Sequence, residues 1–396
     1  MRLDVKSFFF GAVAGGAMTF CICLGILFTM AWIMNSKANG ATASAAPAFC
    51  PTAGDTNITA VLQPIRNKFN LPAMAAAVVT SDGLKLAGAV GIRKRGTETP
   101  VSLDDLWHLG SDAKIMTSTL MARLVESGQL RWDSTLGEVF PDFAPRMNPD
   151  FRSVTLLELL SHHAGLPANL DLAKYSGDDA PQLRRRAVQT ELAKKPVSPP
   201  GSTYAYSNLG YILAAAMAEQ ATGKPWEILI TDEVFKPLHM QSAGFGGTGT
   251  PGKIDQPWPH TANGAPTSEN GPRMDNPPVM GSAGRIHCTI QDWARFVQDQ
   301  LRGARGEPAL LKPESYQRLQ TPPFKGDYAL GWMVVSRSWG GGKVFNHGGD
   351  NTMNCANVWV APKKDFAILV CVNQSGDQAF TASDEAVEAL IGLMEK

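Results

Sequence analysis

The chain of 396 residues has few of the residues that build metal centres. It contains 6 Cys and 7 His, with no CxxC pair, no HExxH motif and no mixed Cys/His cluster. Its one adjacent histidine pair, His162–His163, has no further ligand at a zinc spacing. Neither a metal site nor another cofactor is therefore expected.

An excess of charge of either sign is also missing. The 36 Lys and Arg residues balance 36 Asp and Glu residues, so the formal net charge is zero. Because proteins that bind nucleic acid usually carry a basic excess, nucleic acid is not expected as a ligand. A hydrophobic content of 44% excludes wholesale disorder, and the length suffices for a large core.

One long stretch near the N-terminus, from Phe8 to Met34, has no charged residue. A membrane-spanning helix needs about 20 residues, whereas the apolar part of a signal peptide has about 7–15. Since Arg2 and Lys6 precede the stretch, the positive-inside rule places the rest of the chain on the periplasmic side of the inner membrane. A long cleavable signal, which would release a secreted protein, is the alternative. The predicted order is a transmembrane anchor, a flexible linker and a folded domain, over residues 1–35, 36–56 and 57–396.

Apolar, β-rich segments lie near both ends of the remaining chain, and helical patterns lie between them. The predicted strands are 73–80, 84–92, 354–360 and 366–373. The predicted helices are 112–126, 156–160, 209–220, 292–302 and 383–395. Residues 241–280, rich in Gly, Pro, Asn and Thr, predict a long loop. This order predicts an α+β fold with one antiparallel sheet built from both chain ends, flanked by helices, and a mostly helical middle region.

A serine and a lysine, Ser111 and Lys114, stand three residues apart at the start of a predicted helix. Residues at this spacing share a helix face, so the hydroxyl and the amine can touch. A serine needs such a partner because its hydroxyl is a poor nucleophile at neutral pH. Taken alone, the pair is more typical of an N-cap serine followed by a solvated lysine.

Two further short motifs follow. Tyr206 and Asn208 stand two apart before a predicted helix; the tyrosine could relay a proton if nearby cations lowered its pKa, and the asparagine could contact a substrate carbonyl. A core tyrosine followed by an N-cap asparagine would also explain this motif. His347-Gly348-Gly349-Asp350 precedes the last predicted hairpin at an edge-strand position, where Gly349 would let a ligand approach the backbone. A simple glycine-rich turn is the alternative.

In this order and spacing, the three motifs resemble those of the class C β-lactamases and penicillin-binding-protein-like serine hydrolases. The resemblance implies that Ser111 is the acylated nucleophile, Lys114 its activating partner and Tyr206 the proton relay. It covers most of residues 57–396, including Leu106–Pro141, Leu159–Pro167, Pro200–Gly210, Gly223–Met240, Gly281–Phe296 and Leu330-Gly331-Trp332.

The resemblance also implies which residues contact the substrate, and the sequence differs from the family pattern at some positions near them. The resemblance implies that Asn208 contacts a substrate amide and that the backbone N–H groups of Ser111 and Asp350 form the oxyanion hole. His347 stands at the strand position where β-lactamases of this class carry Lys, and a mostly neutral imidazole suits a substrate carboxylate less well. Met353-Asn354 stand where many members of the resembled family have Gly-Phe, and Arg285 follows Gly284 where a second Gly is common. The resemblance places both departures at the border of the acyl pocket.

The expected function is that of an exported, membrane-anchored serine hydrolase, which acts through an acyl-serine on a small ester or amide. One alternative is a β-lactamase or D-Ala-D-Ala carboxypeptidase of the cell wall; another is an inactive homologue that only binds. An α/β-hydrolase is not expected, because the chain has no Gly-x-Ser-x-Gly motif.

The last predicted hairpin carries one cysteine in each strand, Cys355 and Cys371. If Val360 pairs with Phe366, the two cysteines lie directly opposite each other on one face of the sheet. We then expect neighbouring side chains within reach of a disulfide, which an exported location would permit. A slip of one residue in the loop would break this pairing.

Overall fold

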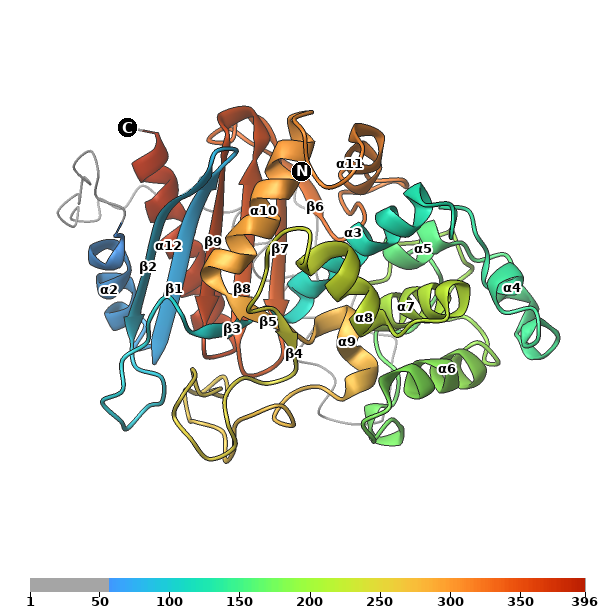
Figure 1. Ribbon diagram of the computed structural model, residues 1–396, viewed down its shortest axis with the longest axis horizontal. Coiled ribbons are helices and arrows are strands. Elements are labelled where there is room, and N and C mark those ends of the chain that lie inside the picture. The colour runs from blue at the N-terminus through green and yellow to red at the C-terminus, as the bar shows by residue number, and fades with distance from the viewer. Residues whose placement is uncertain (1–56, 396) are drawn as a thin grey trace, which may run out of the picture. The chain divides into compact units, whose positions relative to one another are not determined.

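The computed structural model describes residues 57–395, which form one sheet with helices on both faces and a helical region beside it (Figure 1). The anchor and linker predicted over residues 1–56 lie outside the described residues. The six strands of the sheet, in spatial order, are β2 (Gly83–Gly91), β1 (Ala73–Thr80), β9 (Phe366–Val372), β8 (Cys355–Ala361), β7 (Gly342–Asp350) and β6 (Met333–Arg337).

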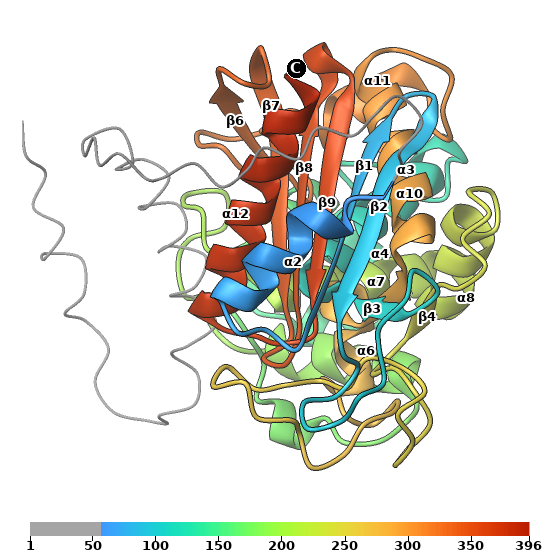
Figure 2. The same cartoon turned by 90° about the vertical axis from the view of Figure 1, so that its left-hand side faces the viewer.

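The two ends of the domain meet inside this sheet. Strand β1 pairs antiparallel with β9, from Met74 opposite Val372 to Val79 opposite Ala367. Figure 2 shows α10 (Ile290–Ala304) against one face of the sheet, and α2 (Thr59–Lys68) and α12 (Asp377–Met394) against the other. The predicted α+β architecture is therefore confirmed.

Strand β1 is buried along nearly all its length, which explains why its sequence does not alternate between apolar and polar residues. Residues 73–79 are all buried, and four of them are alanines. A central strand covered on both faces reads as a continuous apolar run, and small side chains let α10 pack close to it.

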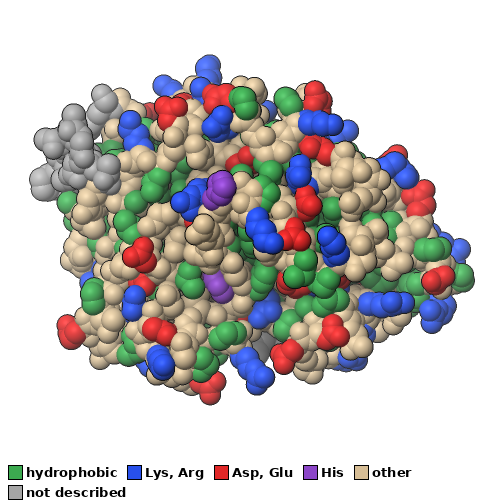
Figure 3. Space-filling view, viewed as in Figure 1, with side chains coloured by type: hydrophobic (Ala, Val, Ile, Leu, Met, Phe, Trp, Pro, Cys, Tyr) green, Lys and Arg blue, Asp and Glu red, His purple; other side chains and the backbone are tan. Residues whose placement is uncertain are grey.

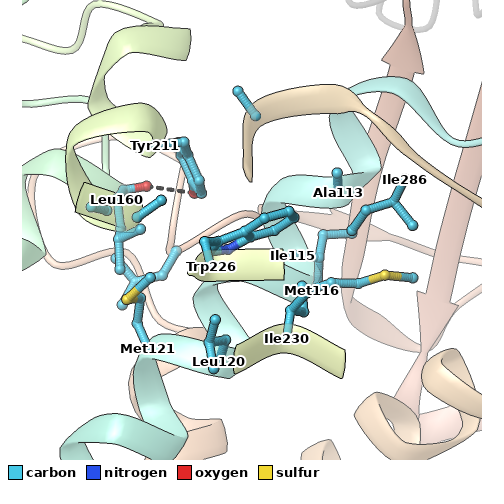
Figure 4. Close-up of a cluster of buried hydrophobic side chains, with 14 of the residues drawn as sticks. Ala113, Ile115, Met116, Leu120, Met121, Leu160, Tyr211, Trp226, Ile230 and Ile286 are labelled. Carbon is cyan, nitrogen blue, oxygen red and sulfur yellow. Dashed lines mark hydrogen bonds between the residues drawn. The ribbon is translucent and has the colours of Figure 1, made fainter. Parts of the chain in front are cut away.

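The helical region is built around α3 (Ala113–Glu126), in which residues 113–122 are all buried. The polar side chains of this span are buried with hydrogen-bond partners; they are Lys114, Thr117, Ser118 and Thr119. Figure 4 shows Ile115, Met116 and Leu120 gathered near Trp226, while the hydroxyl of Tyr211 donates to the carbonyl oxygen of Leu160 at 2.8 Å. The other helices are α4 (Leu136–Val139), α5 (Leu156–Leu160), α6 (Ala180–Glu191), α7 (Asn208–Thr222), α8 (Trp226–Ile230), α9 (Gly281–Gly284) and α11 (Pro313–Leu319).

A second, small sheet escaped prediction because its strands are so short. Its members, in spatial order, are β3 (Leu106–His108), β5 (Ile286–Thr289) and β4 (Gly244–Phe245). The predicted loop 241–280 is otherwise irregular up to a short helical turn at Pro278–Met280. The last helix begins at Asp377, six residues before the predicted start.

The predicted pairing of the two hairpin cysteines is wrong by one residue. Phe366 pairs with Ala361 rather than Val360, so Cys355 lies opposite Val372 and Cys371 lies opposite Ala356. The cause is a shorter connection, made of a turn at Pro362–Lys364 and Asp365 with a left-handed φ of 55°. Because neighbouring residues of a strand point to opposite faces, the cysteines point away from each other, and both are free and buried.

Charged side chains of both signs are mixed over the visible face of the domain. Figure 3 shows Lys and Arg interspersed with Asp and Glu, without a large area of one sign. This distribution agrees with the zero net charge of the sequence. Within residues 57–395, no helix combines the length and the apolar character needed to cross a bilayer.

Candidate active site

Ser111 lies on a tight turn between β3 and α3. The turn Gly110–Asp112 leads directly into α3, and Ser111 is partly exposed while its neighbours in the turn are buried. Gly110 has a positive φ of 52°, and a Cβ atom there would lie only 2.5 Å from the backbone nitrogen of Asp350. Only glycine permits both the turn and this close approach.

The amine of Lys114 lies beside this hydroxyl. Its Nζ donates to Ser111 Oγ at 3.0 Å and to the carbonyl oxygen of Ala283, in α9, at 2.6 Å. The lysine is 0% exposed. Burial lowers the pKa of Lys114 well below its ordinary value, and the nearby charge of Asp112 only partly opposes this shift. Burial therefore favours the neutral amine that a general base requires.

Tyr206 approaches the same serine from the loop that precedes α7. Its hydroxyl donates to Ser111 Oγ at 2.9 Å, and Lys114 Nζ lies 5.0 Å from the centre of its ring. Burial raises the pKa of Tyr206 above its ordinary value. The lowered tyrosine pKa considered from the sequence is thus wrong: the site holds a neutral phenol, able to donate a proton, beside an amine able to accept one.

Asn208 is the first residue of α7 but does not cap it. The cap is Ser207, whose Oγ accepts the N–H of Gly210 at 3.2 Å. Asn208 Nδ2 donates to Asn169 Oδ1 at 2.8 Å, while its own buried Oδ1 has no hydrogen-bond partner within residues 57–395. An amide N–H of a substrate would satisfy this oxygen.

The glycine-rich motif is part of strand β7 rather than a turn. Strand β6 forms the edge of the sheet, but its pairing with β7 ends at Asn346, one residue before the motif. In the described part of the chain, residues 347–350 therefore have no paired strand on that side, as the predicted edge position requires. The Ser111 turn lies against the strand here, since a Cβ at Gly349 would collide with the carbonyl oxygen of Leu109 and lie 3.0 Å from the Ser111 nitrogen. The backbone of Ser111 and that of Asp350 are thereby brought together.

His347 does not offer a free cation to this site. Its Nδ1 lies 2.8 Å from Asp112 Oδ1, its Nε2 lies 3.3 Å from the hydroxyl of Tyr328, and it is 4% exposed. Burial, followed by the charge of Lys114, lowers the pKa of His347 to about 3, and burial raises the pKa of Asp112 well above its ordinary value. Both shifts disfavour the charged forms, so His347, which is held by Asp112 and Tyr328, offers no permanent cation to the site.

Comparison with known proteins identifies the family. Residues 58–393 match the Beta-lactamase family. The chain belongs to this family. It is 29% identical over 322 residues to penicillin-binding protein 4 of Amycolatopsis lactamdurans, covering 78% of this chain and 82% of that protein. It is 24% identical to the D-alanyl-D-alanine-carboxypeptidase/endopeptidase AmpH of Escherichia coli strain K12, covering 80% of this chain and 83% of that protein.

Solved structures give the same fold. A penicillin-binding protein from Bacillus halodurans superposes with a TM-score of 0.66 at 22% identity, covering 83% of this chain and 98% of that chain. D-alanine carboxypeptidase AmpC from Burkholderia cenocepacia gives 0.65 at 21% identity, with coverages of 84% and 97%. As a member of the β-lactamase family, the chain is a serine hydrolase.

Several residues around the site had no role in the sequence interpretation. The ring of His162 packs between Tyr206 and Tyr328, with centroid distances of 4.5 and 4.6 Å. The adjacent histidine pair was visible in the sequence, but its neighbours come from distant segments. Nothing in the sequence indicated that Asp112 binds His347, because the two residues are 235 positions apart.

Proposed function

We propose that this β-lactamase-family chain hydrolyses small, uncharged esters or amides through an acyl-serine intermediate. The observation that carries the proposal is the convergence on Ser111 Oγ of a base and an acid, Lys114 at 3.0 Å and Tyr206 at 2.9 Å. A serine with hydrogen bonds to both a buried amine and a neutral phenol has what acyl transfer requires.

In the proposed first step, Ser111 Oγ bonds to the substrate carbonyl carbon while its proton moves to Lys114 Nζ. The carbonyl oxygen becomes an oxyanion, which the N–H groups of Ser111 and Asp350 would stabilise by roughly 3–4 kcal/mol per donor. As the tetrahedral intermediate collapses, Tyr206 donates its proton to the departing alcohol or amine, and Lys114 restores that proton. Water then attacks the acyl-serine in the same way, which releases the acid and regenerates Ser111.

The preference for uncharged substrates rests on the pairing of His347 with Asp112. A β-lactam or a D-Ala-D-Ala peptide carries a carboxylate, which favours a permanent cation on the strand beside the nucleophile. Here the strand offers no permanent cation, because the pKa of His347 is lowered and its ring is held by Asp112. A second candidate is a D-Ala-D-Ala carboxypeptidase, which the name of the relative AmpH supports.

A substrate panel on the purified chain separates these candidates. We expect kcat/KM for p-nitrophenyl esters of uncharged acids to exceed that for nitrocefin and for peptides ending in D-Ala-D-Ala. A dominant carboxypeptidase or β-lactamase rate would favour the second candidate. Failure of every substrate, together with failure of a fluorophosphonate probe to label Ser111, would indicate an inactive binding homologue.

Changing the charge beside the site tests the role of the His347–Asp112 pair. In His347→Lys alone, we expect the new ammonium to pair with Asp112, so the ratio of nitrocefin to neutral-ester kcat/KM should stay within about twofold. In the double variant Asp112→Asn/His347→Lys, the ammonium is free for a substrate carboxylate, and the ratio should rise by roughly tenfold or more. Asp112→Asn alone is the control. An equal rise in the single and double variants would contradict this account.

We further infer a membrane-anchored position outside the cytoplasm, supported by the uncharged stretch from Phe8 to Met34. The full chain should then sediment with inner membranes and resist extraction by sodium carbonate. Its domain should be digested by protease added to spheroplasts but not by protease added to intact cells. Recovery of an N-terminally shortened chain in the periplasmic fraction would instead indicate a cleaved signal.

A further inference from the structure

One buried carboxylate, Asp275, lies next to the active site without any part in the proposed chemistry. It belongs to the long loop between β4 and α9, which is yellow to orange in Figure 1, and its side chain is 0% exposed. Its Oδ2 lies 2.9 Å from His108 Nε2 and 3.4 Å from Arg285 Nε, and its Oδ1 accepts Asn351 Nδ2 at 3.0 Å. Three separate segments therefore meet at this carboxylate.

The first segment leads to the nucleophile. His108 is the last residue of β3, and its Nδ1 accepts the N–H of Gly110 at 3.1 Å. Because Nδ1 accepts, the imidazole hydrogen lies on Nε2, from which it is donated to Asp275. The carboxylate thus fixes the ring that holds the backbone immediately before Ser111.

The second segment leads to the other side of the oxyanion hole. Asn351 directly follows Asp350, and its Oδ1 accepts the N–H groups of Met353 at 3.2 Å and Asn354 at 2.9 Å. Its side chain is thereby fixed by the turn after β7 and by Asp275 together. Arg285, the third partner, follows the short helix whose Ala283 carbonyl accepts Lys114.

We propose that Asp275 is a positioning residue that sets the oxyanion hole, by tying the segment of the Ser111 N–H to the segment of the Asp350 N–H. The inference rests on the proposed acyl-transfer function. The two segments are 239 positions apart in the chain (350 − 111), and their backbones touch at Gly110 and Gly349 without side chains between them. The two N–H groups of an oxyanion hole must keep their positions within about 0.5 Å of the productive geometry. A residue that binds both segments helps to hold them there.

The test is Asp275→Asn in the full chain, assayed with the best p-nitrophenyl ester. The side-chain amide of asparagine has the size of the carboxyl but only one oxygen that can accept a hydrogen bond. Its NH₂ group would therefore face the donor of either His108 or Asn351. We expect kcat to fall about 10- to 100-fold while KM stays within about twofold, because an oxyanion hole acts on the transition state and not on the bound substrate. Asp299→Asn is the matched control: this buried carboxylate accepts the hydroxyl of Tyr316 at 2.6 Å, remote from the proposed chemistry, and its loss should leave kcat unchanged.

A second variant, Asn351→Ala, keeps the carboxylate but removes its bond from Asn351, together with the two bonds that Asn351 accepts from the turn. We expect a kcat loss of about tenfold, and a loss in the double variant with Asp275→Asn that is clearly smaller than the product of the two single losses, because the bond between Asp275 and Asn351 is lost in both. Additive losses, an unchanged kcat in either variant, or a loss that appears only in KM would overturn the positioning role. If Asp275→Asn does not fold, Asn351→Ala alone decides. A wild-type chain that hydrolyses nothing would reject the proposed function instead, so the two failures are distinct.

Discussion

Replacing Ser111 with alanine should abolish hydrolysis of every substrate that the chain accepts, with a loss in kcat on the order of 10⁴-fold or more. No other hydroxyl in the described structure has hydrogen bonds to both Lys114 and Tyr206. The serine is partly exposed at a helix start, so its loss should cost only about 1 kcal/mol of folding free energy. Steady-state rates and thermal unfolding of the same preparation measure both quantities.

The matched control for this substitution is Ser127→Ala, at the other end of α3. Ser127 is exposed, and its Oγ donates to the Leu124 carbonyl oxygen at 3.2 Å, so this change also removes one hydroxyl from the end of the helix. Its kcat should match that of the wild type. A Ser111→Ala chain that kept a tenth of the activity would reject Ser111 as the nucleophile.

Replacing Lys114 with methionine should lower kcat/KM on the order of 10³-fold and remove its rise with pH. In the wild type, burial lowers the pKa of Lys114, so the amine loses its proton well below pH 10.5 as the pH rises. Since only the neutral amine can accept the Ser111 proton, activity should increase through the neutral range and then level off. The apparent pKa belongs to the coupled groups Ser111, Lys114 and Tyr206 rather than to the lysine alone.

Rates measured from pH 5 to 9 on both proteins test this prediction. The control is Lys236→Met, which removes an exposed lysine that pairs with Asp232 at 2.7 Å on the surface. It should keep the wild-type profile. If the profile of Lys114→Met still rose with pH as that of the wild type does, another group would be the base.

The parts of the fold that follow from local pattern could be predicted. Strands 73–80 and 366–372 are continuous apolar runs, and α3 has a period of three to four residues, so each was recognisable without its neighbours. The register of β8 against β9 could not be predicted, because the left-handed conformation of Asp365 shortens the connection by one residue. A shift of that size reverses the face of every side chain.

The same distinction applies to the candidate site. The contact of Ser111 with Lys114 lies within one helical turn, so its spacing reveals it. Asp275 and His108 are 167 positions apart and meet only because the loop folds back along the end of the small sheet. The partners of Asp112 and His162 likewise come from other segments, so composition and spacing carry no signal for them.

The central claim, an acyl-serine intermediate on Ser111, is tested most directly by intact-mass spectrometry of the chain quenched in acid during turnover of a slowly deacylating p-nitrophenyl ester. The account predicts a mass increase equal to one acyl group, located by peptide mapping on Ser111 and missing from Ser111→Ala. Turnover without any such adduct in the quenched wild type, or an adduct on another residue that persists in Ser111→Ala, would contradict it.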